Sequence, residues 1–271
     1  MKWDLERIRN ESQKFDDSAI FYDKYRPSYP KELIDSIISI SGVREDAKIL
    51  EVGAGSGKAT ELFVNRGYNL TCIELGENLA RKGIEKFKGT GRVEYIVGRF
   101  EEVDGLDKNY DLAISAQAFH WVQKPLGYKK IADALKSNSY CALFWNKYIN
   151  DGSQISNELT EICKEYGVLY MLEYKELIEA SKREIAEIEA SGYFKNIKFL
   201  EYTWQQEQTL EDFINFLSTG NGYIGMKEER KNELKVKLSH VFIKNGDKIT
   251  RYFNCILYIF QNPSAPLGHR Y

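Results

Sequence analysis

The chain has 271 residues, of which 43% are hydrophobic and 13% aromatic, so it can bury a sizeable core as one large domain or two small ones. Its 38 Lys and Arg residues stand against 40 Asp and Glu, and the resulting formal charge of -2 gives no electrostatic case for a nucleic-acid partner. No apolar run approaches the roughly 20 residues that a membrane-spanning helix needs, so we also expect no membrane partner.

The cysteines and histidines bear on the compartment and on metal binding. The four cysteines form neither a C-x-x-C pair nor a Cys/His zinc pattern, and at least two lie in apolar runs typical of buried strands. Such cysteines are typical of a reduced core, so we expect a cytoplasmic protein. With three histidines in the whole chain, a His-based metal site is not expected.

Residues 1–30 are polar and aromatic and end in Tyr22-Asp-Lys-Tyr-Arg-Pro-Ser-Tyr-Pro30. The two prolines favour an extended chain, and the tyrosines and Arg26 form too large a group to lie in water, so the segment should pack on the rest of the protein. On spacing alone we favour a seal over one side of the core. The alternative is a cover over a ligand, with Arg26 as a donor fork for a carboxylate. A helix then begins at Pro30 and ends at Gly42.

The stretch Lys48-Ile-Leu-Glu-Val-Gly-Ala-Gly-Ser-Gly57 predicts a buried strand that ends in a tight glycine turn, followed by a helix over 58–67. Such a turn exposes backbone N–H groups, and residues without a Cβ let a ligand approach them closely. A dinucleotide fingerprint, G-x-G-x-x-G, would need glycine where Lys58 stands, and Glu51 would repel a pyrophosphate. A carboxylate here favours a cationic ligand and argues against a nucleotide-dependent oxidoreductase. The alternative without function is a turn that is merely tight.

A second predicted strand over 68–74 ends in Glu74. The distance in sequence from Gly57 to Glu74 is close to the spacing of about 20 residues at which an acid meets a ribose in nucleotide-binding βαβ units. The two oxygens of a carboxylate match two adjacent hydroxyls, although a solvated glutamate at a strand end is the simpler alternative. A helix over 78–88 and a third strand over 93–98 precede Arg99-Phe-Glu-Glu102.

A fourth strand over 110–116 is followed by Gln117-Ala-Phe-His-Trp-Val122. In open α/β sheets the ligand lies beyond the carboxyl ends of the central strands, at the switch in strand order. Gln117, His120 and Trp121 should therefore lie nearest the chemistry. A histidine between aromatic neighbours is also typical of a hydrogen-bonded packing residue, so both roles stay open for His120.

The alternation of strands and helices predicts an α/β fold with a doubly wound, Rossmann-like, seven-stranded sheet that is mostly parallel. Helical spacing over 151–190 predicts a helical insertion over the cleft, which we interpret as a lid that shapes the substrate pocket. A strand over 197–204, a helix capped by Thr209 and Asp212, and a last strand over 249–260 follow. The Asn245-Gly246 turn predicts that this last strand is antiparallel.

We divide the single predicted domain into four parts: a cleft cover (1–30), a ligand-binding core (31–150), a helical lid (151–192) and the C-terminal part of the same sheet (193–271).

Three of these segments together resemble the class I S-adenosylmethionine-dependent methyltransferases. Their first motif is an acidic residue, one apolar residue and then G-x-G-x-G, as found from Glu51 to Gly57. The strings Y-x-x-Y-R-P-x-Y-P before Pro30 and Q-A-x-H-W after the fourth strand resemble the branch with a methyltransferase type 11 domain that contains the trans-aconitate methyltransferases. The resemblance implies S-adenosylmethionine as cofactor, the predicted sheet, and an N-terminal segment over the cofactor cleft.

The resemblance also implies a set of site residues. In the family an acidic residue usually lies beside the adenine, but Arg99 stands at that position, so we expect this contact from the backbone of Phe100 and from Glu101. The expected substrate contacts are Tyr25 and Trp121, and the expected catalytic residue is His120. The expected cofactor contacts are Tyr22, Arg26, Glu51, Gly53, Ala54, Gly55, Gly57, Glu74, Leu75, Arg99, Phe100, Glu101, Ala116 and Gln117.

The function that follows from the resemblance is direct SN2 transfer of the sulfonium methyl group to a small-molecule substrate. If the nucleophile is a carboxylate, as in the trans-aconitate enzymes, it needs only positioning, which Arg26 can provide. If it is a hydroxyl or an amine, His120 is the candidate proton acceptor. A protein that binds S-adenosylmethionine or S-adenosylhomocysteine without catalysis is the alternative, and the oligomeric state stays open.

Overall fold

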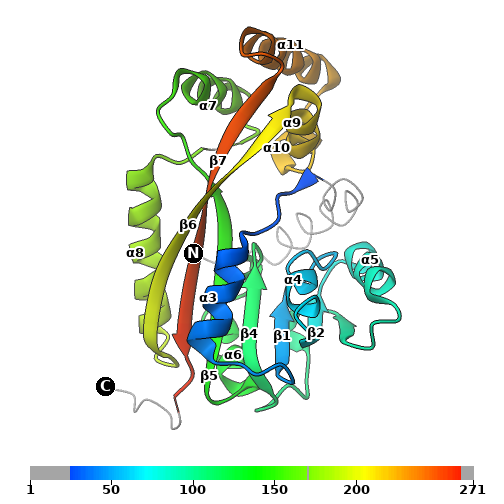
Figure 1. Cartoon of the computed structure of the whole chain (residues 1–271), viewed down its shortest axis with the longest axis vertical. Helices are drawn as coiled ribbons and strands as arrows, with labels where there is room; N and C mark the ends of the chain where they lie inside the picture. Colours follow the sequence, from blue (N-terminus) through cyan, green and yellow to red (C-terminus); the bar gives the residue numbers. More distant parts are fainter. Residues whose placement is uncertain (1–24, 170, 264–271) are drawn as a thin grey trace.

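The computed structural model describes residues 25–169 and 171–263 (Figure 1). Tyr22 and the rest of residues 1–24 lie outside the described part of the chain. None of the helices within it is long and apolar enough to cross a membrane.

One sheet of seven strands organises the molecule, in the order β3-β2-β1-β4-β5-β7-β6. The pairs among β1 to β5 are parallel, whereas β7 is antiparallel to both β5 and β6. The prediction of a mostly parallel sheet with an antiparallel last strand is confirmed. The strands are β1 (Lys48–Val52), β2 (Asn69–Glu74), β3 (Val93–Val97), β4 (Tyr110–Ala116), β5 (Leu135–Tyr148), β6 (Lys195–Thr209) and β7 (Lys248–Gln261).

Helices cover both faces of the sheet because the buried side chains of its central strands alternate between two apolar layers. In β5, Leu143 packs with the layer of α6 and α8, and its neighbour Phe144 with the layer of α3 and α4. The helices of these two layers and of the β3 edge are α3 (Lys31–Ser41), α4 (Thr60–Val64), α5 (Glu77–Phe87), α6 (Leu126–Ala134) and α8 (Tyr174–Ala190), with short 3-10 turns η1 (Phe100–Glu102) and η2 (Phe119–Trp121).

A third apolar cluster lies apart from these layers. β6 and β7 extend beyond the other strands, and the remaining helices gather at that end (Figure 1). The capping box predicted from Thr209 and Asp212 begins the first helix of this group after β6. The helices are α7 (Gln154–Tyr166), α9 (Leu210–Leu217), α10 (Asn221–Ile224) and α11 (Glu228–Lys244).

The predicted helical insertion over 151–192 forms two helices with different neighbours. α8 lies along the sheet and buries Leu177 and Ile188 in its apolar layer, whereas α7 packs on α11 in the third cluster. An apolar stripe turned toward the sheet holds α8 in place by burial. The two helices of the insertion are thus present, in different apolar clusters.

Candidate active site

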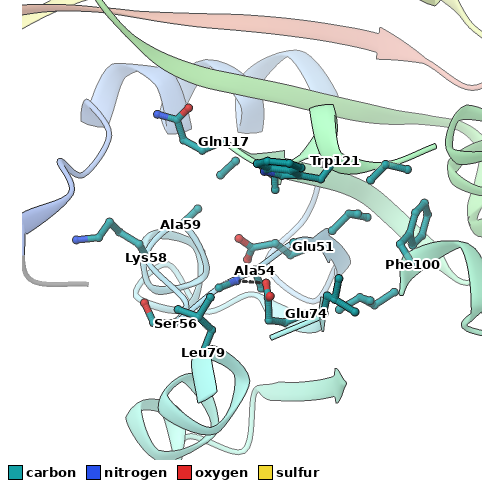
Figure 2. Close-up of a pocket in the computed structure, with 18 of the residues that line it drawn as sticks. Glu51, Ala54, Ser56, Lys58, Ala59, Glu74, Leu79, Phe100, Gln117 and Trp121 are labelled. Atoms are coloured by element: carbon teal, nitrogen blue, oxygen red, sulfur yellow. Dashed lines mark hydrogen bonds between the residues drawn. The ribbon is translucent and has the colours of Figure 1, made fainter. Parts of the chain in front are cut away.

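A cavity of about 400 Å³ opens at the carboxyl ends of β1, β2 and β4 (Figure 2). The strand order reverses between β1 and β4, which is where open α/β sheets bind ligands, and the volume suits a small-molecule site. In Figure 2, Trp121 lies across the cavity from Glu51 and Glu74, and Phe100 lies at one side. The sequence therefore predicted the location of the cavity.

The glycine turn forms part of the wall, and each of its glycines meets a different demand. All three have positive φ angles, of 72°, 58° and 86° at Gly53, Gly55 and Gly57, which favour glycine. A Cβ at Gly53 would overlap the Cβ of Ala118, and one at Gly57 would overlap the ring of Phe87. A Cβ at Gly55 would meet no atom of the described part of the chain within 4 Å and would project into open space there. Gly57 does not line the cavity, so its role is packing, which differs from the predicted ligand contact.

Glu51 contributes a buried carboxyl group to the cavity wall. The residue is 1% exposed, and the hydroxyl of Thr60 donates a hydrogen bond of 2.7 Å to its Oε2. Burial, opposed in part by this hydrogen bond and assisted by the charge of Glu74, raises the pKa of Glu51 to about 8. Without a ligand, Glu51 therefore keeps its proton at neutral pH, and a cation beside it would favour the ionised form.

Glu74 ends β2 with both carboxylate oxygens held by backbone. Gly55 N–H donates to Oε2 over 2.7 Å and Gly76 N–H to Oε1 over 2.8 Å. A carboxylate has about four acceptor sites, more than these two bonds use. The glycine turn thus orients an acceptor-rich group at the cavity, as expected for a partner of adjacent hydroxyls.

The loop after β3 forms one end of the cavity. Phe100 is buried and lines it, and Arg99 lies 3.7 Å from Oε1 of Glu101. The same Oε1 accepts a hydrogen bond of 2.7 Å from the backbone N–H of Gln123. Arg99, which replaces the acid expected from the family pattern, thus neutralises the neighbouring Glu101.

The segment after β4 brings His120 to the cavity. The residue lines the cavity, and Trp145 Nε1–H donates a hydrogen bond of 3.3 Å to its Nδ1. Indole nitrogen can only donate, so Nδ1 carries no proton. Desolvation and then the charges of Lys147 and Lys124 lower the pKa of His120 to about 4, so the ring is neutral and its proton is on Nε2. This geometry makes the ring a hydrogen-bond donor and speaks against the expected proton acceptor.

The N-terminal segment reaches the cavity through Arg26, Pro27 and Tyr29. Arg26 donates to the hydroxyl of Tyr148 over 3.5 Å and to the carbonyl of Thr219 over 3.4 Å. The cover predicted from the aromatic string is therefore at the site in its described part.

Of the sequence-predicted residues, the cavity brings together Arg26, Glu51, Gly53, Ala54, Gly55, Glu74, Leu75, Arg99, Phe100, Glu101, Ala116, Gln117, His120 and Trp121. Tyr25 packs against the third apolar cluster and does not line the cavity.

Sequence reasoning missed several lining residues. Ser56 stands within the glycine motif and Leu79 at the start of the helix after β2, so position in the βαβ unit was the available signal. No described residue of 151–192 lines the cavity, so the lid role of this insertion stays a prediction. The lining residues not predicted are Pro27, Tyr29, Val52, Ser56, Lys58, Ala59, Ile73, Leu79, Gly98, Ala118 and Val122.

Comparisons with known proteins show which family the chain resembles. The model of a family described as "Methyltransferase domain" matches residues 50–143. An "Uncharacterized methyltransferase" of Schizosaccharomyces pombe is 25% identical over 257 residues, which cover 91% of this chain and 95% of the relative. A "Probable S-adenosylmethionine-dependent methyltransferase" of Saccharomyces cerevisiae is 31% identical over 266 residues, which cover 84% of this chain and 86% of that one.

The chain belongs to the S-adenosylmethionine-dependent methyltransferases. Solved structures share the fold of this methyltransferase. The YcgJ protein of Bacillus subtilis matches 86% of this chain and 99% of its own, with a TM-score of 0.55 and 14% identity. The phosphoethanolamine N-methyltransferase 2 of Haemonchus contortus, solved with S-adenosylhomocysteine, matches 94% of this chain and 59% of its own, with a TM-score of 0.53 and 16% identity. The narrower likeness to trans-aconitate methyltransferases stays a prediction.

The cavity of the methyltransferase fits its cofactor, S-adenosylmethionine, in chemistry. The cofactor carries two cationic groups and two adjacent ribose hydroxyls but no phosphate. Glu51 and Glu74 supply the carboxyl groups that such a ligand calls for, and the open space over Gly55 leaves the turn accessible to it. Membership of this family argues against the alternative function, a nucleotide-dependent oxidoreductase.

Proposed function

We propose that this methyltransferase transfers the methyl group of S-adenosylmethionine to the carboxylate of a small molecule by in-line SN2 displacement. When bound, the cofactor supplies a methyl group on a sulfonium, a good leaving group, so alignment in a dry cleft can account for most of the rate. The acceptor must then be positioned and must be a nucleophile already. A carboxylate is ionised at neutral pH and needs no base.

The hydrogen bond from Trp145 to His120 is the observation that supports a carboxylate acceptor. A hydroxyl acceptor would need a base in the cleft to take its proton, and an amine acceptor would have to arrive in its neutral form. His120 accepts at Nδ1 from the indole and bears its proton on Nε2, so it has no site at which to receive another without breaking that bond. An Nε2–H donor instead suits an acceptor that arrives as an anion.

Arg26 and Trp121 are the proposed positioning groups for the acceptor. A guanidinium donates a fork of N–H groups that matches a carboxylate, and Arg26 lies on the cavity wall. The ring of Trp121 lies 4.9 Å from that of His120, centroid to centroid, so an acceptor beside His120 would also meet an apolar face. Tyr25 packs next to this region and is proposed to support it.

For the cofactor, we propose that Glu74 binds the ribose hydroxyls and Glu51 the cationic amino-acid portion. The glycine turn provides backbone contact and Phe100 the apolar contact to the adenine, with Glu101 beside it. The proposed wall of the cofactor site is completed by Arg26, Gly53, Ala54, Gly55, Leu75, Arg99, Ala116 and Gln117.

The test is incubation with S-adenosylmethionine labelled in its methyl group and a panel of small mono-, di- and tricarboxylic acids. Methyl esters release labelled methanol in alkali, whereas N-methyl and ether products do not. Alkali-labile label in an acid-dependent product is the expected result. Alkali-stable product would contradict the carboxylate acceptor, and tight cofactor binding without product would favour the non-catalytic alternative.

A further inference from the structure

Arg251 is a buried cation that no carboxylate contacts within the described residues. It lies on β7 and is 5% exposed. Its Nη1 donates a hydrogen bond of 2.9 Å to Oε1 of Gln208, which is also buried, and its Nη2 is buried with no hydrogen-bond partner among residues 25–169 and 171–263. A buried charge is normally paired, because leaving water is costly. The position of Arg251 therefore calls for a reason beyond packing.

Four aromatic rings surround the guanidinium of Arg251. Its central carbon lies 4.9, 4.8, 4.6 and 5.2 Å from the ring centroids of Tyr148, Phe213, Phe216 and Phe253. Cation–π contacts attract the charge without neutralising it. Burial lowers the pKa of Arg251 to about 10, so the guanidinium is still protonated at neutral pH. Its positive charge acts through surroundings of low dielectric, where it is poorly screened.

The aromatic rings connect Arg251 to the cleft. The guanidinium groups of Arg251 and Arg26 both lie over the ring of Phe216, and the guanidinium carbon of Arg26 is 5.3 Å from the ring centroid. Tyr148 likewise faces Arg251 with its ring and accepts from Arg26 with its hydroxyl. The positive charge of Arg26 contributes to lowering the pKa of Arg251, so the two cations repel one another. Arg26 lines the cavity, and an anion bound there would offset this repulsion.

We propose that Arg251 is a specificity-determining residue whose buried charge, acting through Tyr148 and Arg26, makes this end of the cleft bind a carboxylate group. The carboxylate belongs either to the acceptor or to the amino-acid portion of the cofactor. The acceptor arm rests on the proposed function, and the cofactor arm does not. Proteins break a packing rule mostly at functional sites, and the unpaired buried charge of Arg251 is such a break.

The test measures binding of ligand pairs that differ by their carboxylates. For the cofactor arm, the pair is S-adenosylhomocysteine and its decarboxylated analogue, 5'-(3-aminopropylthio)-5'-deoxyadenosine, which keeps the amine and lacks the carboxylate. For the acceptor arm, propane-1,2,3-tricarboxylate and its neutral triamide are titrated into protein loaded with S-adenosylhomocysteine. The variants are Arg251→Met, which removes the charge, and Arg251→Lys, which keeps it. Arg230→Met is the matched control, because Arg230 also lies over a ring, that of Tyr166, but is exposed.

Arg251→Met is expected to weaken binding of at least one carboxylate ligand about tenfold, which corresponds to about 1.4 kcal/mol of lost attraction. Binding of the carboxylate-free member of the same pair should change less than about twofold. Arg251→Lys and Arg230→Met should bind all the ligands with affinities near those of the wild type. The affected pair identifies the source of the carboxylate.

The proposal is overturned if Arg251→Met weakens both members of each pair equally, if it weakens neither, or if the wild-type protein prefers no carboxylate ligand. Should Arg251→Met not fold, Arg251→Gln takes its place with the same expectations. Failure of all adenosyl ligands to bind the wild-type protein would instead refute the cofactor assignment.

Discussion

Replacement of Glu51 by glutamine should make the unliganded protein more stable and its cofactor binding weaker. Glu51 is buried in the cavity wall with a pKa of about 8, far above the ordinary 4.5. Glutamine has nearly the same shape and can still accept from the hydroxyl of Thr60. It has no proton to lose, so Glu51→Gln removes the titration and leaves the packing.

The magnitude follows from the proton that the folded protein retains. The unfolded chain loses this proton near pH 4.5 and the folded protein near pH 8, so between these values the unfolding free energy of the wild type falls as pH rises. At about 1.4 kcal/mol per pH unit, the loss reaches about 3 kcal/mol at pH 7 and levels off above pH 8. Burial of the second amide proton costs about 1 kcal/mol. Glu51→Gln should therefore gain about 2 kcal/mol at pH 7 and be about 1 kcal/mol less stable than the wild type near pH 4.5, where only the cost of the buried amide remains.

Urea denaturation of the unliganded protein at several pH values measures this difference. Glu94→Gln is the matched control, since Glu94 is exposed on β3 and the same change there should stay within about 0.5 kcal/mol. Calorimetry should show S-adenosylmethionine binding at least tenfold more weakly to Glu51→Gln, because the variant cannot become the carboxylate that a cation favours. A stability difference that is absent, or that does not change between pH 5 and pH 8, would refute the reasoning.

Three further outcomes follow from the site. Gly55→Leu should abolish binding of S-adenosylhomocysteine while lowering stability by only about 1–2 kcal/mol, because the new side chain enters open space at a left-handed φ. Gly57→Ala should instead lower stability and leave binding of S-adenosylhomocysteine largely intact, because its Cβ overlaps the ring of Phe87. Equal effects of the two variants on affinity, measured by calorimetry, would contradict this division. Glu74→Gln should weaken binding of S-adenosylhomocysteine at least tenfold and lower the melting temperature, because the amide NH2 group cannot accept one of the two backbone N–H hydrogen bonds that the carboxylate accepts. An unchanged melting temperature would argue against those hydrogen bonds. With saturating cofactor, the pH profile of kcat/KM for an acid substrate should show no titration of His120 between pH 6 and 8. A transition in that profile near pH 6.5 that His120→Gln removes would show that the histidine does titrate there.

The sheet and the cofactor end of the site could be predicted from the sequence because local patterns encode them. The turn after β1 needs glycine at three places within five residues, and the carboxylate of Glu74 ends the next strand. The Asn245-Gly246 turn indicated the direction of β7, but its position between β5 and β6 depends on pairing between distant segments. The helix predicted from Lys58 begins at Thr60, because the glycine turn continues through that interval.

The acceptor end was much less predictable. An arginine in a strand is typical of a solvent-facing position, so the burial of Arg251 could not be read from its neighbours in sequence. Its aromatic surroundings come from β5, α9 and β7, which meet only in the folded chain. The tautomer of His120 likewise depends on Trp145 of another strand.

The buried charges suggest how the same cleft can bind substrates more tightly than products. Under the proposed reaction, a cationic cofactor and an anionic acceptor enter, and a neutral thioether and a neutral ester remain at the reacting centre. Glu51 favours the cationic ligand once ionised, and Arg251 favours the anionic one through Arg26. Methyl transfer removes the charge of the acceptor, so the interaction through Arg26 weakens and the cost of burying Arg251 returns to the protein, whereas the ammonium proposed to lie beside Glu51 stays on the cofactor product. The fixed charge of Arg251 therefore favours release of the methylated acceptor, and a methyl ester should bind the Arg26 end of the cleft more weakly than its parent acid by about the factor that Arg251→Met removes.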